Sequence, residues 1–222
     1  MKQLILWSDI SNICDPASNY ELMSGKMAEF ADRILNCKDA LKRKQSVVSA
    51  LMQKHVAQLY GLTKVVVTYG KHGKPIMQDV NFNISHSVDM VVCAVSDSFV
   101  GCDIELVRKA PLEVALRYFR DEENEYLDSV PDDEKNLAFF RLWTAKESYL
   151  KMTGAGLQGG LGTFYVNFDK ARSEKPAIIC DGTVQSCTLN EIAIPGHDDY
   201  VCFVCNQNGI FEPEFQEFVG FF

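Results

Sequence analysis

The segment FVGCDIE, residues 99–105, decides how the first half of this 222-residue chain folds. Because successive side chains of a β-strand point to opposite faces, Asp103 and Glu105 share one face, whereas Cys102 and Ile104 share the other. Two carboxylates on an apolar strand are costly to bury as bare charges, so they need water, a basic partner or a cation. An exposed strand end would satisfy them equally well, and this segment alone leaves both interpretations open.

A second segment, WTAKESYLK at residues 143–151, has a helical pattern. Glu147 and Lys151 are four residues apart, so they lie on neighbouring turns of one helix face. Alone, such a pair is most often a surface ion pair of little consequence. Trp143 lies one turn earlier on the same stripe, and a large aromatic side chain indicates that this face packs inward. The carboxylate and the lysine are therefore candidates for a site.

Taken together, these residues favour a magnesium site. Mg²⁺ prefers carboxylate oxygens and takes the rest of its shell from water and substrate phosphates. Asp103, Glu105 and Glu147, with Lys151 nearby, suit chemistry on a pyrophosphate or phosphate ester. Zinc would require cysteine or histidine ligands, and the nearest cysteine, Cys102, faces away.

The first block of the chain is predicted to be a helix followed by a small sheet. Residues 39–60 have apolar positions near a helical period, with basic residues on the first turns. Short runs rich in β-branched residues follow. They are KVVVTY (64–69), FNIS (82–85), VDMVVCAV (88–95) and FVGCDIE.

The second block repeats this order. Helices are expected at 111–119 and 134–152, followed by strands at 163–168, 177–180, 184–189 and 200–205. Helix then sheet, twice over, predicts an α+β fold of two similar halves, residues 1–108 and 109–222, that meet near 106–111. We expect the Phe-rich end, FEPEFQEFVGFF (211–222), to fold onto the second half.

Composition excludes several classes of protein. The net charge of −8 argues against wrapping nucleic acid through bulk charge. The sequence contains no run of about 18 apolar residues, so no membrane span is predicted. We expect a cytoplasmic monomer. The eight cysteines lack the dense spacing of a secreted disulfide scaffold, so we expect reduced core residues. Cys202 and Cys205 form a C-x-x-C, but they lie within an apolar run suited to a buried strand.

The two acidic segments resemble the paired signature of the 4′-phosphopantetheinyl transferases, especially the Sfp type. VGCDIE is followed about forty residues later by WTAKESYLK, which is the order and separation of that signature. Gly73-Lys74-Pro75, NISHS (83–87) and RYFRDEENEYL (117–127) are similar to further family segments, and the last of these aligns Glu123.

The resemblance implies an activity and a fold. The family transfers the phosphopantetheine arm of coenzyme A to a serine of an apo acyl, peptidyl or polyketide carrier protein and releases 3′,5′-ADP. Its two similar α+β halves are related by a pseudo-two-fold axis, with the active site at their interface. Carried over to this chain, Asp103, Glu105 and Glu147 ligate Mg²⁺, or Mn²⁺ in its place. Glu147 is then the base for the carrier serine, and Lys151 contacts the pyrophosphate.

The resemblance also implies residues for the nucleotide end of coenzyme A. Lys74, Ser85 and His86 would lie near its 3′-phosphate and adenine. Upstream the match is looser, and the basic residues Arg43, Lys44 and Lys54 are all candidates for gripping the 3′-phosphate.

Two other functions remain open at this point. One is another Mg²⁺-dependent phosphotransferase or hydrolase that uses the same carboxylates, although the chain lacks the G-x-x-x-x-G-K-[ST] loop of common ATP-binding enzymes. The other is an inactive module that binds coenzyme A or a carrier protein. All three carboxylates are present, which argues against lost catalysis.

Overall fold

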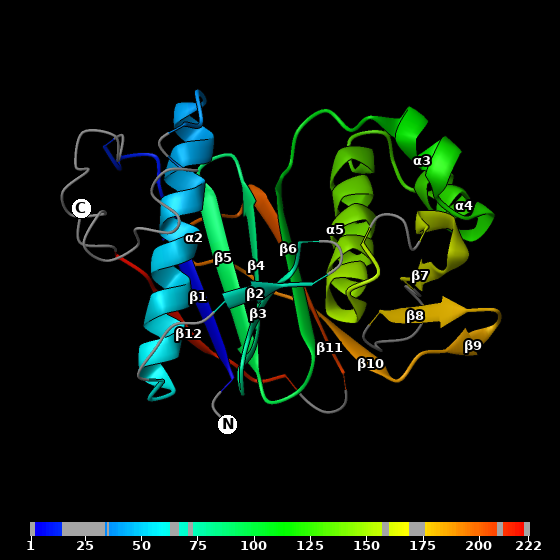
Figure 1. Ribbon diagram of the computed structural model, residues 1–222. Helices are drawn as coiled ribbons and strands as arrows, with labels where there is room; N and C mark the ends of the chain where they lie inside the picture. Colours follow the sequence, from blue (N-terminus) through cyan, green and yellow to red (C-terminus); the bar gives the residue numbers. More distant parts are fainter. Residues whose placement is uncertain are drawn as a thin grey trace.

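Two sheets, each covered by one long helix, make up most of the molecule (Figure 1). The computed structural model describes residues 3–14, 34, 36–62, 67–70, 73–156, 160–168, 176–207 and 211–219. Within these residues the mixture of helices and sheets confirms the predicted α+β class.

The first sheet has the strand order β12-β1-β5-β4. Its strands are Glu214–Glu217, Leu4–Asp9, Met90–Ser96 and Asn81–Ser87. Every residue of the central β5 is buried, and helix α2 (Ala40–Leu59) packs on this sheet through an apolar stripe that includes Val48, Met52 and Val56. Asp39 begins α2, because its carboxylate accepts hydrogen bonds from the free amides of Leu41 and Lys42.

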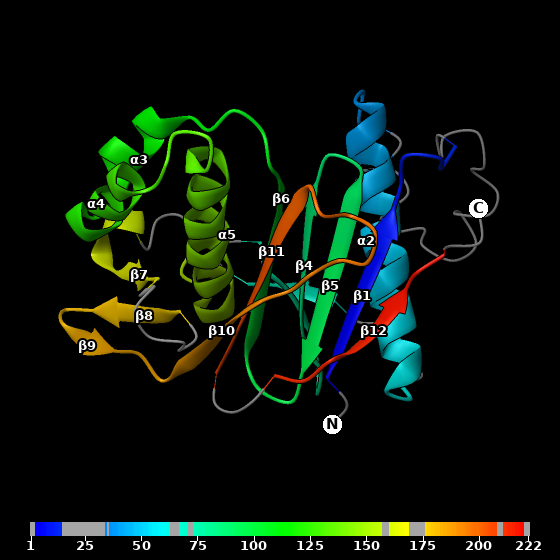
Figure 2. The same ribbon diagram turned by 180° about the vertical axis from the view of Figure 1, so that it is seen from behind.

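The second sheet has the order β10-β11-β6, with bounds Cys187–Glu191, Tyr200–Gln207 and Val100–Leu106. Helix α5 (Lys135–Thr153) packs on β6 and β11 and ends at Gly154, whose left-handed conformation (φ 73°) suits glycine. Figure 2 shows β10 and β11 beside α5 from behind. The remaining elements are α3 (Leu112–Tyr118), α4 (Asp121–Ser129), a 3₁₀ turn (Leu161–Thr163), β2 (Val67–Tyr69), β3 (Pro75–Met77), β7 (Tyr165–Asn167), β8 (Ala177–Cys180) and β9 (Thr183–Val184).

The two sheets meet where β4 lies beside β6. Side chains of β4 bridge the strands: Asn83 accepts the amide of Cys102 at 2.8 Å, and Ser85 donates to Asp103 at 2.8 Å. The next pair along is Ser87 and Glu105. These successive contacts run in the same direction along both strands. The predicted acidic strand therefore lies at the junction between the sheets.

The sequence pattern located both long helices and most of the strands, and it missed four elements. The helix predicted at 39–60 is α2, the one at 134–152 is α5, and the strand at 99–105 is β6. Strands β1, β3 and β12 and helix α4 were not predicted. The division at residue 108 stays a prediction, and β6, which precedes it, pairs with β11, which follows it.

The expected place of the Phe-rich end was wrong. Residues 214–217 form β12, which pairs in parallel with β1 of the first sheet, and Phe218 packs on the core of that sheet. The parallel partner lies some 210 residues earlier in the chain, and no local pattern identifies such a partner.

The cysteine prediction was correct in part. All eight cysteines are free, and Cys93, Cys102, Cys202 and Cys205 are fully buried as expected. Cys14 is exposed, while Cys37, Cys180 and Cys187 are partly exposed, so the core assignment was wrong for these four. Cys180 and Cys187 belong to the short strands β8 and β10, whose residues are only partly buried at these positions.

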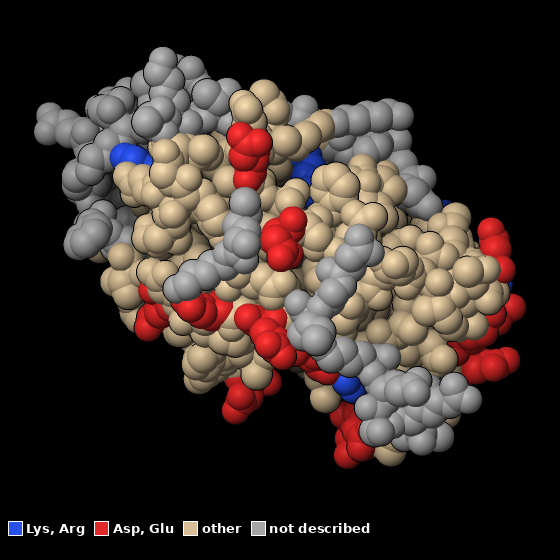
Figure 3. Space-filling model, turned by 90° about the horizontal axis from the view of Figure 1, so that it is seen from below, with Lys and Arg blue, Asp and Glu red and all other residues tan. Residues whose placement is uncertain are grey.

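Charge is spread over the surface. In the view from below, acidic side chains appear at several places and basic ones at few (Figure 3), which agrees with the net charge of −8. Among the helices of the described residues, none combines the length and the apolar character needed to cross a membrane.

Candidate functional site

The centre of the candidate site is an ion pair between β6 and α5. The ammonium of Lys151 lies 2.6 Å from Asp103 Oδ1 and donates to Ser85 Oγ at 2.8 Å. Desolvation acts to lower the pKa of Lys151, but the charge of Asp103, the hydrogen bond to Asp103 and the charges of Cys102 and Glu147 together outweigh it, so the pKa of this lysine is raised. Three predicted site residues from three different elements thus meet at one point.

Glu105 lies two residues further along the same face of β6. Its Oε2 accepts a hydrogen bond from Ser87 at 2.8 Å and lies 3.9 Å from Arg108. Desolvation raises its pKa, and the hydrogen bond from Ser87 opposes that shift. The predicted common face for Asp103 and Glu105 is borne out, because both carboxylates accept a hydrogen bond from a serine of β4.

Glu147 supplies the third carboxylate from α5. Its Oε1 is buried and has no hydrogen-bond partner among the described residues. Desolvation, followed by the negative charge of Asp103, raises its pKa to about 7, while Lys151 acts in the opposite direction. A carboxyl group with a pKa near neutral can accept or release a proton under ordinary conditions.

A close approach of strand and helix brings these groups together. A Cβ added to Gly101 would collide with the backbone of α5 at Ser148 and Met152. Only glycine lets β6 lie this near the helix, two residues before Asp103 and against the backbone at Lys151 and at the residue that follows Glu147. The local sequence thus sets the spacing of the site.

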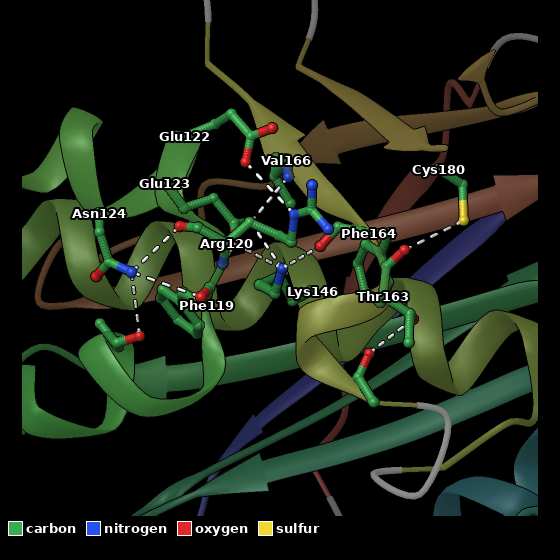
Figure 4. Close-up of polar contacts among 12 residues, drawn as sticks. Phe119, Arg120, Glu122, Glu123, Asn124, Lys146, Thr163, Phe164, Val166 and Cys180 are labelled. Carbon is green, nitrogen blue, oxygen red and sulfur yellow. Dashed lines mark hydrogen bonds and ion pairs between the residues drawn. The ribbon is translucent and has the colours of Figure 1, made fainter. Parts of the chain in front are cut away.

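The residue before Glu147 has a structural role that sequence reasoning missed. Lys146 is fully buried, and its ammonium lies 2.7 Å from both carboxylate oxygens of Glu123 on α4. It also donates to Phe164 O at 2.8 Å, and Glu123 accepts the amide of Val166 (Figure 4). The pair therefore ties α4, α5 and the start of β7 together behind the site.

A sequence signal for this pair existed. Phe139, Leu142, Lys146 and Leu150 follow one helical stripe, and all are buried. A lysine on an apolar stripe needs a buried acidic partner, since a lone charge there would be too costly. The family resemblance had aligned Glu123 without a role, and the structure shows it to be that partner.

The residues predicted for the nucleotide end lie in different places. Ser85 contacts the acidic centre directly. The ring of His86 reaches solvent at the end of β4, and its pKa is lowered first by desolvation and then by the charge of Lys151. His86 thus follows Ser85 in β4 and lies within range of the charge of Lys151.

The upstream basic residues lie on α2. Arg43 donates to Cys37 O, and Lys44 lies 3.5 Å from Ile10 O. Gln45, next in sequence, donates to Val88 O in the turn that follows His86 and Ser87, so the first turns of α2 lie beside that end of β4. Lys54 lies between two and three turns further along the helix.

Lys74 lies on the other side of the site. Its ammonium contacts the carbonyl oxygens of Val100, Lys151 and Met152. A cavity of about 500 Å³ opens next to it, lined mainly by apolar side chains that include Ile76, Phe99 and Met152. A smaller cavity of about 340 Å³ lies beside Glu105 and Trp143.

Carboxylate oxygens are suitable ligands for a hard cation, but the side chains here are not already arranged around a metal site. Within the described residues, no group of three or more His, Cys, Asp or Glu side chains is arranged to hold a metal ion. Asp103 is instead bonded to Lys151. Its other oxygen, Oδ2, and Glu147 Oε1 are buried acceptors with no partner among the described residues. Such oxygens suit Mg²⁺, with Asp103, Glu105 and Glu147 as the residues that would hold it.

Comparison with known proteins matches this part of the chain. Residues 99–205, which run from β6 through α5 to β11, match the family model described as "4′-phosphopantetheinyl transferase superfamily". The matched segment is similar to that superfamily and spans just under half of the 222-residue chain. The match includes Asp103, Glu105, Glu147 and Lys151, and the family recognised from the sequence motifs is confirmed.

Relatives in the superfamily cover part of the chain. The 4′-phosphopantetheinyl transferase gsp of Aneurinibacillus migulanus is 33% identical over 144 residues, which are 64% of this chain and 60% of that protein. Psf-1 of Bacillus pumilus is 34% identical over 54% of each chain. Sfp of Bacillus subtilis (strain 168) is 41% identical over 44% of each. The matched part of the chain thus spans between 44% and 60% of the length of these three proteins.

Proposed function

We propose that this chain transfers the 4′-phosphopantetheine arm of coenzyme A to a serine of an apo carrier protein and releases 3′,5′-ADP. The observation that carries the proposal is the meeting of Asp103, Ser85 and Lys151, with Glu147 close by, inside the segment that matches the transferase superfamily. The relatives reported above are named 4′-phosphopantetheinyl transferases, and their name is extended to this chain as a proposal.

The proposed reaction breaks one phosphorus–oxygen bond and forms another. The carrier serine oxygen attacks the phosphorus atom next to the pantetheine arm, and the oxygen that joins the two phosphates leaves with 3′,5′-ADP. The serine must lose its proton as the new bond forms. Glu147 receives this proton, directly or through water, because burial among carboxylates gives it a pKa near 7.

Lys151 has a complementary role in this proposal. Its ammonium extends from α5 to Asp103 on β6, and there it offsets the negative charge that develops on the departing phosphate. To do so it exchanges part of its contact with Asp103 for the pyrophosphate. Mg²⁺ held by Asp103, Glu105 and Glu147 would neutralise pyrophosphate charge when bound, and Mn²⁺ offers similar chemistry.

The nucleotide end of coenzyme A is proposed to lie towards β4 and the first turns of α2. Ser85 contacts the acidic centre, His86 follows it in β4, and Arg43 and Lys44 lie near the following turn. Lys54 stays a candidate for the 3′-phosphate. The resemblance also proposes Lys74 for this end, but its contacts favour another role, which is argued below.

The proposed partners are coenzyme A and an apo carrier protein, with no role for nucleic acid or a membrane. We also propose that the protein acts as a monomer in the cytoplasm. An overall charge of −8 gives no bulk attraction for an acidic carrier, so docking depends on local surface.

The test is the intact mass of an apo carrier protein incubated with the enzyme, coenzyme A and Mg²⁺. We expect a gain of about 340 Da, the mass of the arm, and no gain with EDTA or with a carrier whose acceptor serine is replaced by alanine. Several unrelated carriers should be tried. No mass gain on any of them would defeat the proposal.

The same experiment separates the other functions. A hydrolase would release 3′,5′-ADP from coenzyme A without any change in the mass of the carrier. An inactive module would bind coenzyme A in calorimetry but release nothing. The buried, unpartnered oxygens of Asp103 and Glu147 argue against an inactive module, since keeping them costs stability.

A further inference from the structure

Lys74 joins the β2–β3 turn to the end of helix α5. The β2–β3 hairpin lies across the sheet junction and extends towards α5 (Figure 1). From its edge, the Lys74 ammonium lies 2.6 Å from Lys151 O, 3.1 Å from Val100 O and 3.4 Å from Met152 O. The residues it connects are as many as 78 positions apart in sequence.

These contacts use the hydrogen-bonding capacity of the side chain. A lysine ammonium has three donors and no acceptor, and three carbonyl oxygens surround this one. Burial lowers the pKa of Lys74, so the surrounding protein already bears a cost for holding it. A phosphate could be contacted by Lys74 only if carbonyl contacts were lost.

The carbonyl groups of Lys151 and Met152 are in the last turn of α5, which ends at Thr153. The last four carbonyls of a helix have no partner within it, and they form the negative end of the helix dipole. A cation at that position satisfies two of them and is favourable to the helix. Lys74 thus acts as a cap supplied from a distant part of the chain.

The same helix end carries the candidate catalytic lysine. The carbonyl of Lys151 accepts from Lys74, while its ammonium bonds Asp103 and Ser85. The third acceptor, Val100, starts β6 and precedes Gly101, where the strand touches the α5 backbone. Lys74 therefore holds the helix to the strand at the point that sets the distance between Lys151 and Asp103.

We propose that Lys74 is a positioning residue that fixes the last turn of α5 against the start of β6, so that Lys151 is aligned with Asp103 for the transfer. This inference rests on the proposed function for its catalytic consequence. Its structural part, the attachment of the helix end, does not depend on that function.

The kinetic test compares Lys74→Met and Lys74→Arg with the parent protein. Misplacing a catalytic group by about 1 Å can cost about 10²-fold in rate, so we expect Lys74→Met to lower kcat by about 10- to 10²-fold. We expect the KM for coenzyme A to change by less than about threefold, because no nucleotide contact is removed. Arginine also donates to carbonyl oxygens, so Lys74→Arg should recover part of the lost kcat.

The opposite kinetic result would overturn the inference. If Lys74 instead grips the nucleotide, Lys74→Met should raise the KM for coenzyme A by about tenfold or more, as expected for a lost charged hydrogen bond, with kcat unchanged. Lys135→Met is the matched control: this lysine is at the first turn of the same helix and, within the described residues, pairs with exposed Asp132 at 2.9 Å. It should leave both constants near those of the parent.

A second measurement does not need activity. Hydrogen exchange of the amides at 150–153 should be faster in Lys74→Met than in the parent and in Lys135→Met, while exchange at 138–146 stays the same. Unchanged protection at 150–153 would contradict the inference even if the protein proved to have no transferase activity. If Lys74→Met fails to fold, the same comparison is made with Lys74→Arg, whose amides at 150–153 should exchange at an intermediate rate. Exchange equal to that of the parent, together with an increased KM for coenzyme A, would overturn the inference.

Discussion

At the scale of the residue, Glu147 has a proposed catalytic role, and its burial carries a cost in stability. Its side chain is partly buried near Asp103 and Glu105, and its buried oxygen Oε1 has no partner among the described residues. Natural proteins retain such groups mainly where chemistry requires them. The neighbouring Lys146 is charged and fully buried too, but it is completely paired with Glu123, and so it contributes to the framework.

Replacing Glu147 tests its catalytic role. We expect Glu147→Gln to keep the fold and the affinity for coenzyme A, since glutamine has nearly the same shape. The rate of transfer should fall by about 10²- to 10⁴-fold, because the amide can neither take a proton nor bind a cation as a carboxylate does. Single-turnover kinetics with saturating carrier would measure this. Turnover close to that of the parent would show that the chemistry lies elsewhere.

The raised pKa of Glu147 also predicts how stability depends on pH. Its ordinary pKa is 4.5 and its folded pKa is about 7. The folded state thus holds the proton more tightly, so its stabilising contribution is complete below pH 4.5 and is lost as the pH rises through 7. In EDTA, Glu147→Gln should therefore be more stable than the parent at pH 8, by about 1–2 kcal/mol after allowance for solvent screening.

Thermal unfolding of both proteins in EDTA at pH 5 and pH 8 measures this effect. The difference in Tm should be about 2–6 °C at pH 8 and close to zero at pH 5. An equal difference at the two pH values would mean that ionisation of Glu147 is not its source.

At the scale of the element, the site depends on how closely β6 packs against α5. A Cβ on Gly101 would meet backbone atoms of Ser148, Lys151 and Met152, which cannot rotate away as a side chain can. The glycine of the motif is therefore explained by packing.

Gly101→Ala should destabilise the protein by about 3 kcal/mol or more and reduce transfer activity, since the strand must move away from Lys151. Urea unfolding gives the free energy. Gly70→Ala is the control, because a Cβ there would have contacts no shorter than 3.5 Å, and it should change stability by less than about 1 kcal/mol. Equal effects of the two substitutions would contradict the packing explanation.

At the scale of the whole molecule, the chain crosses between the sheets repeatedly. β6 joins β11 and β10, while β12 near the C-terminal end joins β1 near the N-terminal end. Phe211, which precedes β12, is buried with Ile5, Trp7 and Cys202, and this cluster draws residues from both sheets. The end of the chain thus helps to hold the sheets together.

Phe211→Ala should lower the free energy of unfolding by about 3–5 kcal/mol, the usual cost of removing a buried phenylalanine. The control is Phe215→Ala on β12, whose ring is 48% exposed, and its cost should stay below about 1 kcal/mol. Urea titration of the three proteins provides the comparison. If both substitutions cost the same, Phe211 has no part in joining the sheets.

The sequence by itself determined the features that depend on neighbouring residues. Periodicity located α2, β6 and α5, and alternation along β6 put Asp103 and Glu105 on one face. The paired motifs then identified the superfamily.

Only the tertiary structure decided which distant groups meet. Lys74 caps a helix end 77 residues later, Lys146 pairs with Glu123, and β12 returns to β1. These contacts are chosen by burial and by the need to pair buried charges and carbonyls, which depend on the folded arrangement as a whole. The apolar stripe of α5 indicates that Lys146 needs an acidic partner, but only the folded structure shows that this partner is Glu123. The acidic strand was therefore visible in the sequence, while the pairing of distant residues around it was not.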